Sequence, residues 1–267
     1  MQRPPAHLLA SVAILAALSV GGCSTTTGTS SDTTGSITTD TTPRSQVQWR
    51  QEMDSWGERY RANPSDPDAA IRYAQALRAI GQRAQAAAVL EQAALNNQDN
   101  RVLLGAYGRA LADNGSYQQA LEVLNRAHSQ DQPDWRILSV QGAVLDQMGR
   151  HTDAQRHYAS ALRLMPNEPS VLSNLGLSYA LSKKLKEAEE TLRLASAQRG
   201  AEPKVRQNLA LVVGLQGRFQ EAETIAKGDL SPDEAAANVA YLRQMLAQQG
   251  DWKKGKRGSP LVPTTGS

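Results

Sequence analysis

The sequence of 267 residues is long enough for one or two ordinary domains. Its 29 basic and 26 acidic side chains give a formal net charge of only +3, and this balance argues against nucleic acid as a partner. Cys23 is the only cysteine, which excludes an internal disulfide.

The N-terminal segment has the layout of a secretory signal. Arg3 precedes an apolar run of 13 residues from Leu8 to Val20, which is shorter than the roughly 20 residues that a membrane-spanning helix needs. The run leads into Val20-Gly21-Gly22-Cys23 instead of a small-x-small cleavage site. We predict that residues 1–22 are a signal peptide.

The four residues ending at Cys23 resemble a bacterial lipobox. The resemblance implies that Cys23 becomes the N-terminal residue and carries a diacylglycerol thioether and an amide-linked acyl chain such as palmitate. Ser24, where aspartate would favour retention in the inner membrane, implies an outer-membrane lipoprotein facing the periplasm. The alternative is an ordinary signal peptide followed by a coincidental cysteine.

Residues 23–45 are rich in serine and threonine, which make up fourteen of the twenty residues from Ser24 to Pro43. Such a composition cannot bury a core, so we predict a flexible linker. Residues 46–63 then place Trp49, Trp56 and Tyr60 on one helical face. We interpret this stretch as a half-unit that closes the following array, the alternative being a mobile tether.

One alanine recurs every 34 residues, at Ala86, Ala120, Ala154, Ala188 and Ala222. A small residue also recurs earlier in each period, at Ala74, Gly108, Gly142, Gly176 and Ala210. A fixed period of this length indicates stacked helix–turn–helix units, and small residues allow the two helices of a unit to approach closely. The predicted units lie near residues 67–100, 101–134, 135–168, 169–202 and 203–230.

The period, with small residues at unit positions 8, 20 and 27 and large ones at 11 and 24, resembles the tetratricopeptide repeat. The resemblance implies an all-α, right-handed superhelix of antiparallel helix pairs that binds other proteins. Unit four departs from the pattern with Lys183 at the turn glycine, and unit five departs with Ala226 and Asp229. We therefore expect the second helix of unit five to end early.

A closing helix is predicted at residues 231–250. It begins at Ser231, with proline next and Glu234 completing a capping box, and Gly250 is expected to end it. Val239, Leu242 and Leu246 would face the preceding unit. Residues 251–267 are interpreted as a basic disordered tail.

The sequence offers little for catalysis or for metal binding. His151 and His157 are six residues apart, which does not place them on one helical face, and no second cysteine is available. The segment from Gly250 to Lys256 fits the glycine and lysine skeleton of a phosphate-binding loop, but Arg257 stands where serine or threonine must bind magnesium. We expect no enzyme activity, no cofactor, no metal and no small-molecule substrate, with a nucleotide-using enzyme as the remote alternative.

The tetratricopeptide resemblance also implies a concave groove lined by the first helix of each unit. The assigned positions begin polar, with Arg72, Gln75, Arg78, Arg109, Arg136, Ser139 and Asp146, and become apolar later. Two asparagines and four leucines recur one period apart and form the predicted partner-binding groove: Asn174, Leu177, Leu181, Asn208, Leu211 and Leu215. We call these six residues the ladder. Its asparagines could bond the backbone of an extended or helical peptide while its leucines contact the side chains. Alternatively, the leucines pack under the closing helix.

The signal, linker and repeats, together with residues 207–219 and 231–242, resemble the TadD family, the tetratricopeptide lipoproteins of the tight-adherence (Tad/Flp, type IVb) pilus assembly system. The resemblance implies a non-enzymatic role in pilus assembly and secretion, as a pilotin-like partner of the secretin or of another Tad component. The alternative is a general periplasmic adaptor lipoprotein for envelope or peptidoglycan machinery.

Overall fold

The computed structural model describes residues 45–129 and 131–257. By its internal contacts the chain divides into Met1–Pro43 and Arg44–Ser267, and every described residue belongs to the second unit. The predicted signal peptide, the acylated Cys23 and the linker up to residue 44 therefore lie outside the described residues, as do the last ten residues of the predicted tail.

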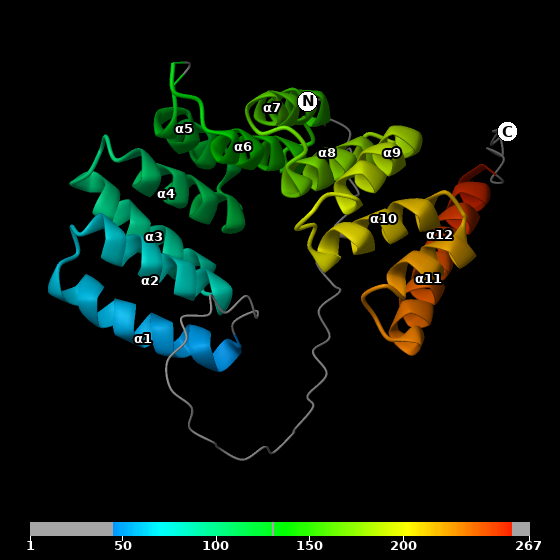
Figure 1. Cartoon of the computed structure of the whole chain (residues 1–267), viewed down its shortest axis with the longest axis horizontal. Helices are drawn as coiled ribbons and strands as arrows, with labels where there is room; N and C mark the ends of the chain where they lie inside the picture. The colour runs from blue at the N-terminus through cyan, green and yellow to red at the C-terminus, as the bar shows by residue number, and fades with distance from the viewer. Residues whose placement is uncertain (1–44, 130, 258–267) are drawn as a thin grey trace, which may run out of the picture. The chain divides into compact units, whose positions relative to one another are not determined.

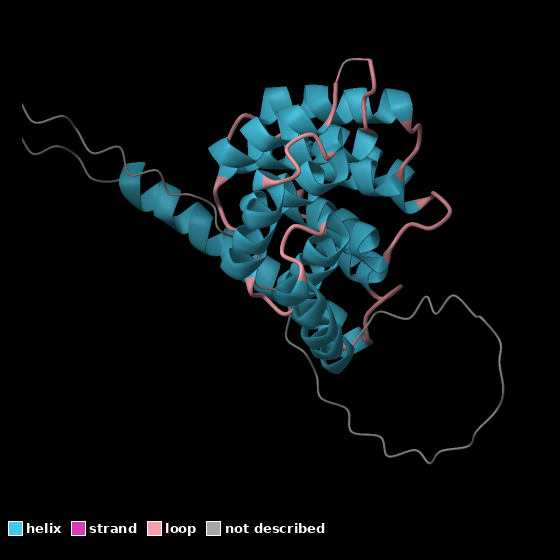
Figure 2. Cartoon of the chain, turned by 90° about the vertical axis from the view of Figure 1, so that its left-hand side faces the viewer, coloured by secondary structure: helices cyan, strands magenta, loops and turns pink. Residues whose placement is uncertain are grey.

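The described residues form helices joined by short loops, and they contain no strand (Figure 2). Within this part of the chain, twelve helices follow one another in chain order (Figure 1). Their bounds are α1 Gln46–Ala62, α2 Pro67–Ala79, α3 Arg83–Leu95, α4 Arg101–Asp113, α5 Tyr117–Ala127, α6 Trp135–Gln147, α7 His151–Leu164, α8 Pro169–Leu181, α9 Leu185–Ser196, α10 Pro203–Leu215, α11 Phe219–Ala226 and α12 Pro232–Arg257.

Five helix pairs correspond to the five predicted units, and the all-α repeat architecture is confirmed. The first helices, α2, α4, α6, α8 and α10, begin at residues 67, 101, 135, 169 and 203, the predicted start of each unit. Polar residues immediately before four of them accept hydrogen bonds from the first backbone amides: Asp66, Asn100, Asp134 and Glu168. These N-caps fix where the first four units start.

The 34-residue alanine column lies at the centre of the packing between paired helices. All five alanines are fully buried. At the preceding small position, a Cβ added to Gly142 would lie 2.6 Å from the ring of Tyr158. The close approach of α6 and α7 therefore requires glycine there, as the pattern predicted.

The turn inside unit four carries backbone strain that the other units avoid. Gly81, Gly115, Gly149 and Gly217 all adopt positive φ, and Lys183 at the same position has φ of +65°. A residue with a side chain is destabilised at positive φ by steric contacts with its own backbone, whereas glycine is not. The helix–turn–helix unit still forms because the packed helices on both sides of the turn hold its backbone in this conformation.

Helix α1 packs on α2 and so covers the first unit. It begins at Ser45, which forms a capping box with Gln48. Trp56 and Tyr60 pack against the buried cluster of the first units, and the rings of Tyr60 and Tyr73 lie 5.6 Å apart between centroids. Two of the three aromatic residues that the sequence placed on one face, Trp56 and Tyr60, are therefore used for packing.

At the other end, α11 stops at Ala226, close to the expected early end. Asp229 follows this helix and forms an ion pair with Arg206 of α10, with 2.7 Å between Arg206 Nε and Asp229 Oδ2. The Asp229 side chain is only 7% exposed. This ion pair links the end of the shortened second helix to its first helix.

The closing helix α12 starts with the expected capping box, in which the Ser231 amide donates to Glu234 Oε2 at 3.0 Å and the Glu234 amide donates to Ser231 Oγ at 3.3 Å. However, α12 does not end at Gly250 but continues to Arg257. A single glycine costs a helix about 1 kcal/mol and does not by itself terminate it. The phosphate-loop skeleton therefore lies inside a helix, where backbone amides bond to the preceding turn.

Candidate partner-binding groove

The first helices of successive units form an inner layer. Each of α2, α4, α6 and α8 contacts the next first helix, whereas no such contact joins consecutive second helices in the described unit. The first helices are therefore closer together than the second helices, so their free faces line the inner side of the stack. The predicted partner-binding groove lies on this layer.

Asn174 on α8 and Asn208 on α10 make the same contact one unit apart. Asn174 Nδ2 donates to Ser139 Oγ at 3.3 Å, and Asn208 Nδ2 donates to Ser173 Oγ at 3.0 Å. In each case the serine belongs to the first helix of the preceding unit. These bonds orient each amide and leave its carbonyl oxygen and second hydrogen for a ligand.

The four groove leucines, Leu177, Leu181, Leu211 and Leu215, are half-buried. The buried clusters in which α12 takes part contain its Ala235 and Val239 but none of these leucines. Leu242 of α12 lies over Gly214, where an added Cβ would be 2.5 Å away. The use of the leucines as a partner surface stays a prediction.

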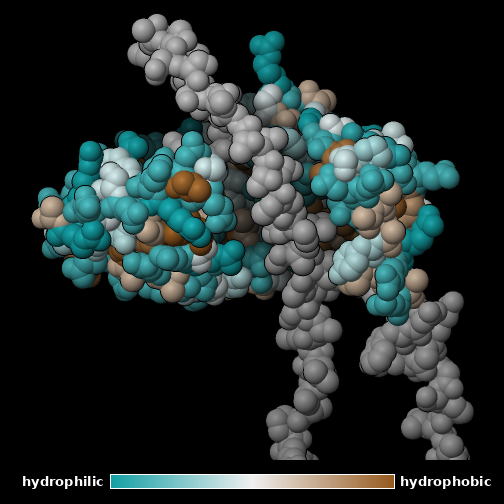
Figure 3. All heavy atoms as spheres, turned by 90° about the horizontal axis from the view of Figure 1, so that it is seen from below, coloured by the Kyte–Doolittle hydropathy of each residue, from teal (hydrophilic) through white to brown (hydrophobic). Residues whose placement is uncertain are grey.

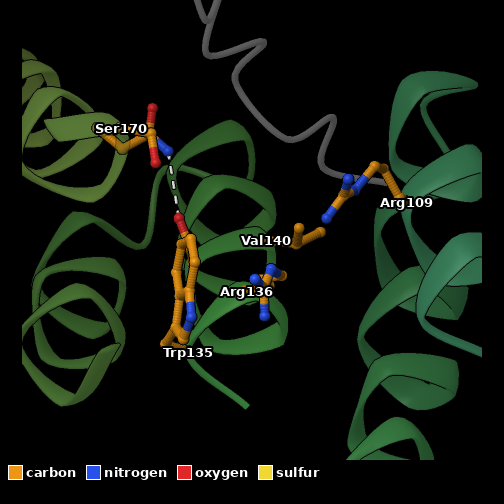
Figure 4. Close-up of a pocket in the computed structure, with 7 residues that line it drawn as sticks. Arg109, Trp135, Arg136, Val140 and Ser170 are labelled. Atoms are coloured by element: carbon orange, nitrogen blue, oxygen red, sulfur yellow. Dashed lines mark hydrogen bonds between the residues drawn. The ribbon is translucent and has the colours of Figure 1, made fainter. Parts of the chain in front are cut away.

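A cavity of about 380 Å³ opens beside Asn174, between α4, α6 and α8. Figure 4 shows Arg109 approaching it from α4, while Trp135 and Arg136 come from the start of α6. We call it the arginine pocket; its lining residues are Arg109, Trp135, Arg136, Ser139, Val140, Ser170 and Asn174. The sequence placed Arg109, Arg136, Ser139 and Asn174 in the groove but did not indicate a cavity.

The arginine pocket is positively charged. Burial lowers the pKa of Arg109, and the nearby charge of Arg78 lowers it further. The guanidinium carbon of Arg136 lies 4.6 Å from the ring centroid of Trp135, a cation–π contact. The site can therefore attract an anion.

Two polar residues assigned to the groove bond to other side chains of the protein instead. Asp146 is only 7% exposed. Its carboxylate accepts hydrogen bonds from Tyr158 at 3.1 Å and from Ser178 at 2.8 Å, and His151 Nδ1 lies 2.8 Å from it. Arg78 of α2 pairs with Asp113 of α4 at 2.5 Å. Neither Asp146 nor Arg78 lines the arginine pocket.

His151 and His157 do not converge on a common site. His151 contacts Asp146, whereas His157 Nδ1 lies 3.0 Å from the backbone oxygen of Asp153. Among the described residues no group of three or more potential metal ligands occurs.

The outer surface offers no broad apolar patch on the face seen in Figure 3, which is mostly hydrophilic with hydrophobic side chains in separate patches. The exposed large hydrophobic residues come from several helices: Val47, Leu95, Val102, Leu164, Met165, Leu194 and Tyr241. None of the described helices has both the length and the apolar character needed to cross a membrane.

Sequence comparison supports the repeat assignment over two stretches. Residues 71–134 and residues 147–212 each match a tetratricopeptide repeat family. No curated protein matches the sequence.

The fold resembles several solved structures. The crystal structure of PilW, a widely conserved type IV pilus biogenesis factor, aligns with a TM-score of 0.62 at 15% identity, covering 73% of this chain and 91% of PilW. A thermophilic repeat protein of Thermus thermophilus aligns with a TM-score of 0.59 at 22% identity, covering 66% of this chain and all of the other. At such identities the likeness establishes the fold alone. Proteins of this fold are generally non-enzymatic scaffolds for protein–protein interaction, and this chain is a tetratricopeptide-repeat protein.

Proposed function

We propose that the protein is a lipid-anchored scaffold of the outer membrane that faces the periplasm and helps assemble a Tad/Flp (type IVb) pilus. In this role it captures the secretin, or another component of the pilus secretion apparatus, in a pilotin-like manner. The observation that carries the proposal is the order of parts along one chain: a lipobox at Cys23, a Ser/Thr linker and a repeat superhelix with a groove.

The pilus assignment draws support from two directions. Residues 207–219 and 231–242 resemble the TadD lipoproteins, and in the structure they form most of α10 and the first part of α12. The fold is also similar to that of PilW, itself a type IV pilus biogenesis factor. A groove that binds protein segments fits the assembly role, since assembly needs recognition and no bond chemistry.

The lipid and the groove have separate tasks in this proposal. Acyl chains contribute about 0.8 kcal/mol per buried methylene, so several chains hold the protein at the membrane permanently. Tethering raises the local concentration of the groove near membrane-bound partners. Modest affinity is then sufficient for capture.

Two neighbouring substitutions test the proposal in the cells that produce the protein. Cys23→Ala removes the acylated sulfur, and Ser24→Asp keeps it while supplying the residue associated with inner-membrane retention. We expect Cys23→Ala to lose labelling by a palmitate analogue and to reduce surface pili to the level of a gene deletion. We expect Ser24→Asp to stay labelled, to fractionate with the inner membrane and also to lose pili.

Normal piliation in both the deletion strain and the Cys23→Ala strain would contradict the pilus role. Envelope or peptidoglycan defects in the same deletion strain, with pili intact, would indicate the general adaptor role instead. Labelling that persists in Cys23→Ala would contradict acylation at this residue.

A further inference from the structure

The arginine pocket and the predicted partner-binding groove share one residue. Asn174 lines the pocket and also begins the ladder that continues through Leu177 and Leu181 on α8. The pocket lies over units two to four, and the ladder lies over units four and five. A ligand that follows the first helices would therefore meet a basic cavity and an apolar strip in succession.

The nearby carboxylates of Asp113 and Asp134 favour the charged form of Arg109 through space, but neither forms an ion pair with an arginine of the pocket. Among the described residues, neither Arg109 nor Arg136 forms an ion pair. Asp113 is paired with Arg78 at 2.5 Å, and Asp134 caps α6 by accepting the Arg136 amide at 2.7 Å. Both acids make their hydrogen bonds with other groups, so the guanidinium donors of Arg109 and Arg136 remain available to an external anion.

Keeping the Arg109 guanidinium charged in the pocket costs free energy, and a bound carboxylate would offset this cost. Arg109 is half-buried, and burial together with the charges of Arg78 and Arg136 disfavours its charged form more than the charges of Asp113 and Asp134 favour it. Trp135 supports the Arg136 guanidinium from one side at 4.6 Å. Guanidinium groups bind carboxylates through charge-assisted hydrogen bonds, which are stronger than neutral ones.

We propose that the arginine pocket binds the side-chain carboxylate of an aspartate or glutamate in an extended segment of the partner protein, whose apolar residues lie on Leu177 and Leu211. The inference rests on the proposed function, because it requires a protein ligand in the groove. The amide of Asn174, oriented by Ser139, bonds the backbone of the segment between the acidic and apolar positions.

The spacing of the helices sets the spacing within the ligand. Packed helices lie about 8–10 Å apart, and an extended chain advances about 3.3 Å per residue. The segment therefore places about three residues on each unit. We expect the acidic residue about three positions from an apolar one, in a segment with further apolar residues on the same side.

The test uses the purified full-length protein in detergent and a random library of octapeptides with amidated C-termini. Peptides retained by the protein are sequenced, and the tightest binder is compared with its Glu→Gln or Asp→Asn counterpart by fluorescence anisotropy. The comparison is repeated on Arg109→Gln/Arg136→Gln, on Arg136→Gln alone, and on Arg83→Gln/Arg163→Gln. The last variant removes two charges from the second helices α3 and α7 and is the matched control; circular dichroism checks the fold of each variant.

We expect retained peptides to carry one acidic residue at the stated spacing, and its amide counterpart to bind the unmodified protein at least about tenfold more weakly. The pocket variants should bind both peptides equally, whereas the control should keep the preference. Retained apolar peptides without an acid, or a preference that survives in Arg109→Gln/Arg136→Gln, would overturn the inference while leaving the proposed function intact. If no peptide is retained, both the groove function and the inference fail.

Discussion

The two halves of the inner layer share one backbone plan but carry different chemistry. The first helices of units two and three present Arg109 and Arg136, whereas those of units four and five present half-buried leucines such as Leu177 and Leu211. The fully buried alanine column runs through both halves. The difference shows that the repeat fixes the scaffold, while the exposed positions of the first helices are free to specify a partner.

The two halves meet at Asp146. Its carboxylate joins Tyr158 within unit three to Ser178 of unit four, and burial, followed by the adjacent Asp146 charge, raises the pKa of Tyr158. The junction is therefore a polar contact inside an otherwise apolar stack.

The largest expected effect comes from breaking this junction. Asp146→Ala leaves the Tyr158 and Ser178 hydroxyls and the His151 ring without their acceptor, and we expect a loss of about 3 kcal/mol in the free energy of unfolding. Urea denaturation at pH 7 measures it. Asp113→Ala breaks only the surface pair with Arg78 and should cost less than about 1 kcal/mol. Equal losses in the two variants would contradict the structural role of Asp146.

The asparagine pair tests the link between stability and binding in the apolar half. Asn174→Ala/Asn208→Ala removes two hydrogen bonds between units and should cost about 1 kcal/mol for each in urea denaturation. It should also weaken binding of the peptide selected from the library, because the two amides no longer contact the ligand backbone. Undiminished peptide binding with unchanged helicity would show that the asparagines only join the units.

The turn of unit four offers a smaller and opposite change. Lys183→Gly should stabilise the protein by about 0.5–1 kcal/mol in urea denaturation, because glycine adopts positive φ without the steric cost of a side chain. The matched reversal, Gly149→Lys, places the strain in unit three and should destabilise by a similar amount. Lys183→Gly that destabilises would mean that this side chain makes contacts that outweigh the strain.

A further expected effect is a pH dependence in the apolar half. Burial would raise the pKa of Glu189, but hydrogen bonds from Gln216, Arg193 and Arg218 outweigh it and lower the pKa to about 2. The contribution of Glu189 to stability is therefore complete above its ordinary value of 4.5 and is lost as the pH falls towards about 2. The stability difference between the unmodified protein and Glu189→Gln should shrink from pH 6 to pH 3 in urea denaturation. A constant difference over this range would contradict the carboxylate network.

Most of the fold could be predicted because the repeat signal is local. The alanine column and the small residues facing it set the period, and the five unit starts agree with the structure. The acidic and amide caps before the first helices carried the same information: Asp66, Asn100, Asp134 and Glu168 also lie 34 residues apart. The extension of α12 past Gly250 was missed because one glycine weakens a helix without ending it.

The candidate site was less predictable because it depends on contacts between units. The sequence places Arg78 and Arg109 in the groove, but only the structure shows that Arg78 is paired with Asp113 while Arg109 lines a cavity. Asp146 likewise has a groove position in the pattern and a buried side chain in the fold. Which polar residues remain available depends on side-chain pairing across helices, which periodicity does not encode.

The central claim is that the inner face of the first helices binds the partner. Site-specific photocrosslinking in cells tests it most directly, with the crosslinker at Leu177 in the groove and, as the control, at Leu194, which is 46% exposed on the second helix α9. The account predicts a crosslink to a component of the pilus secretion apparatus from Leu177 and none from Leu194. Crosslinks to that component from Leu194, with none from Leu177, would contradict it.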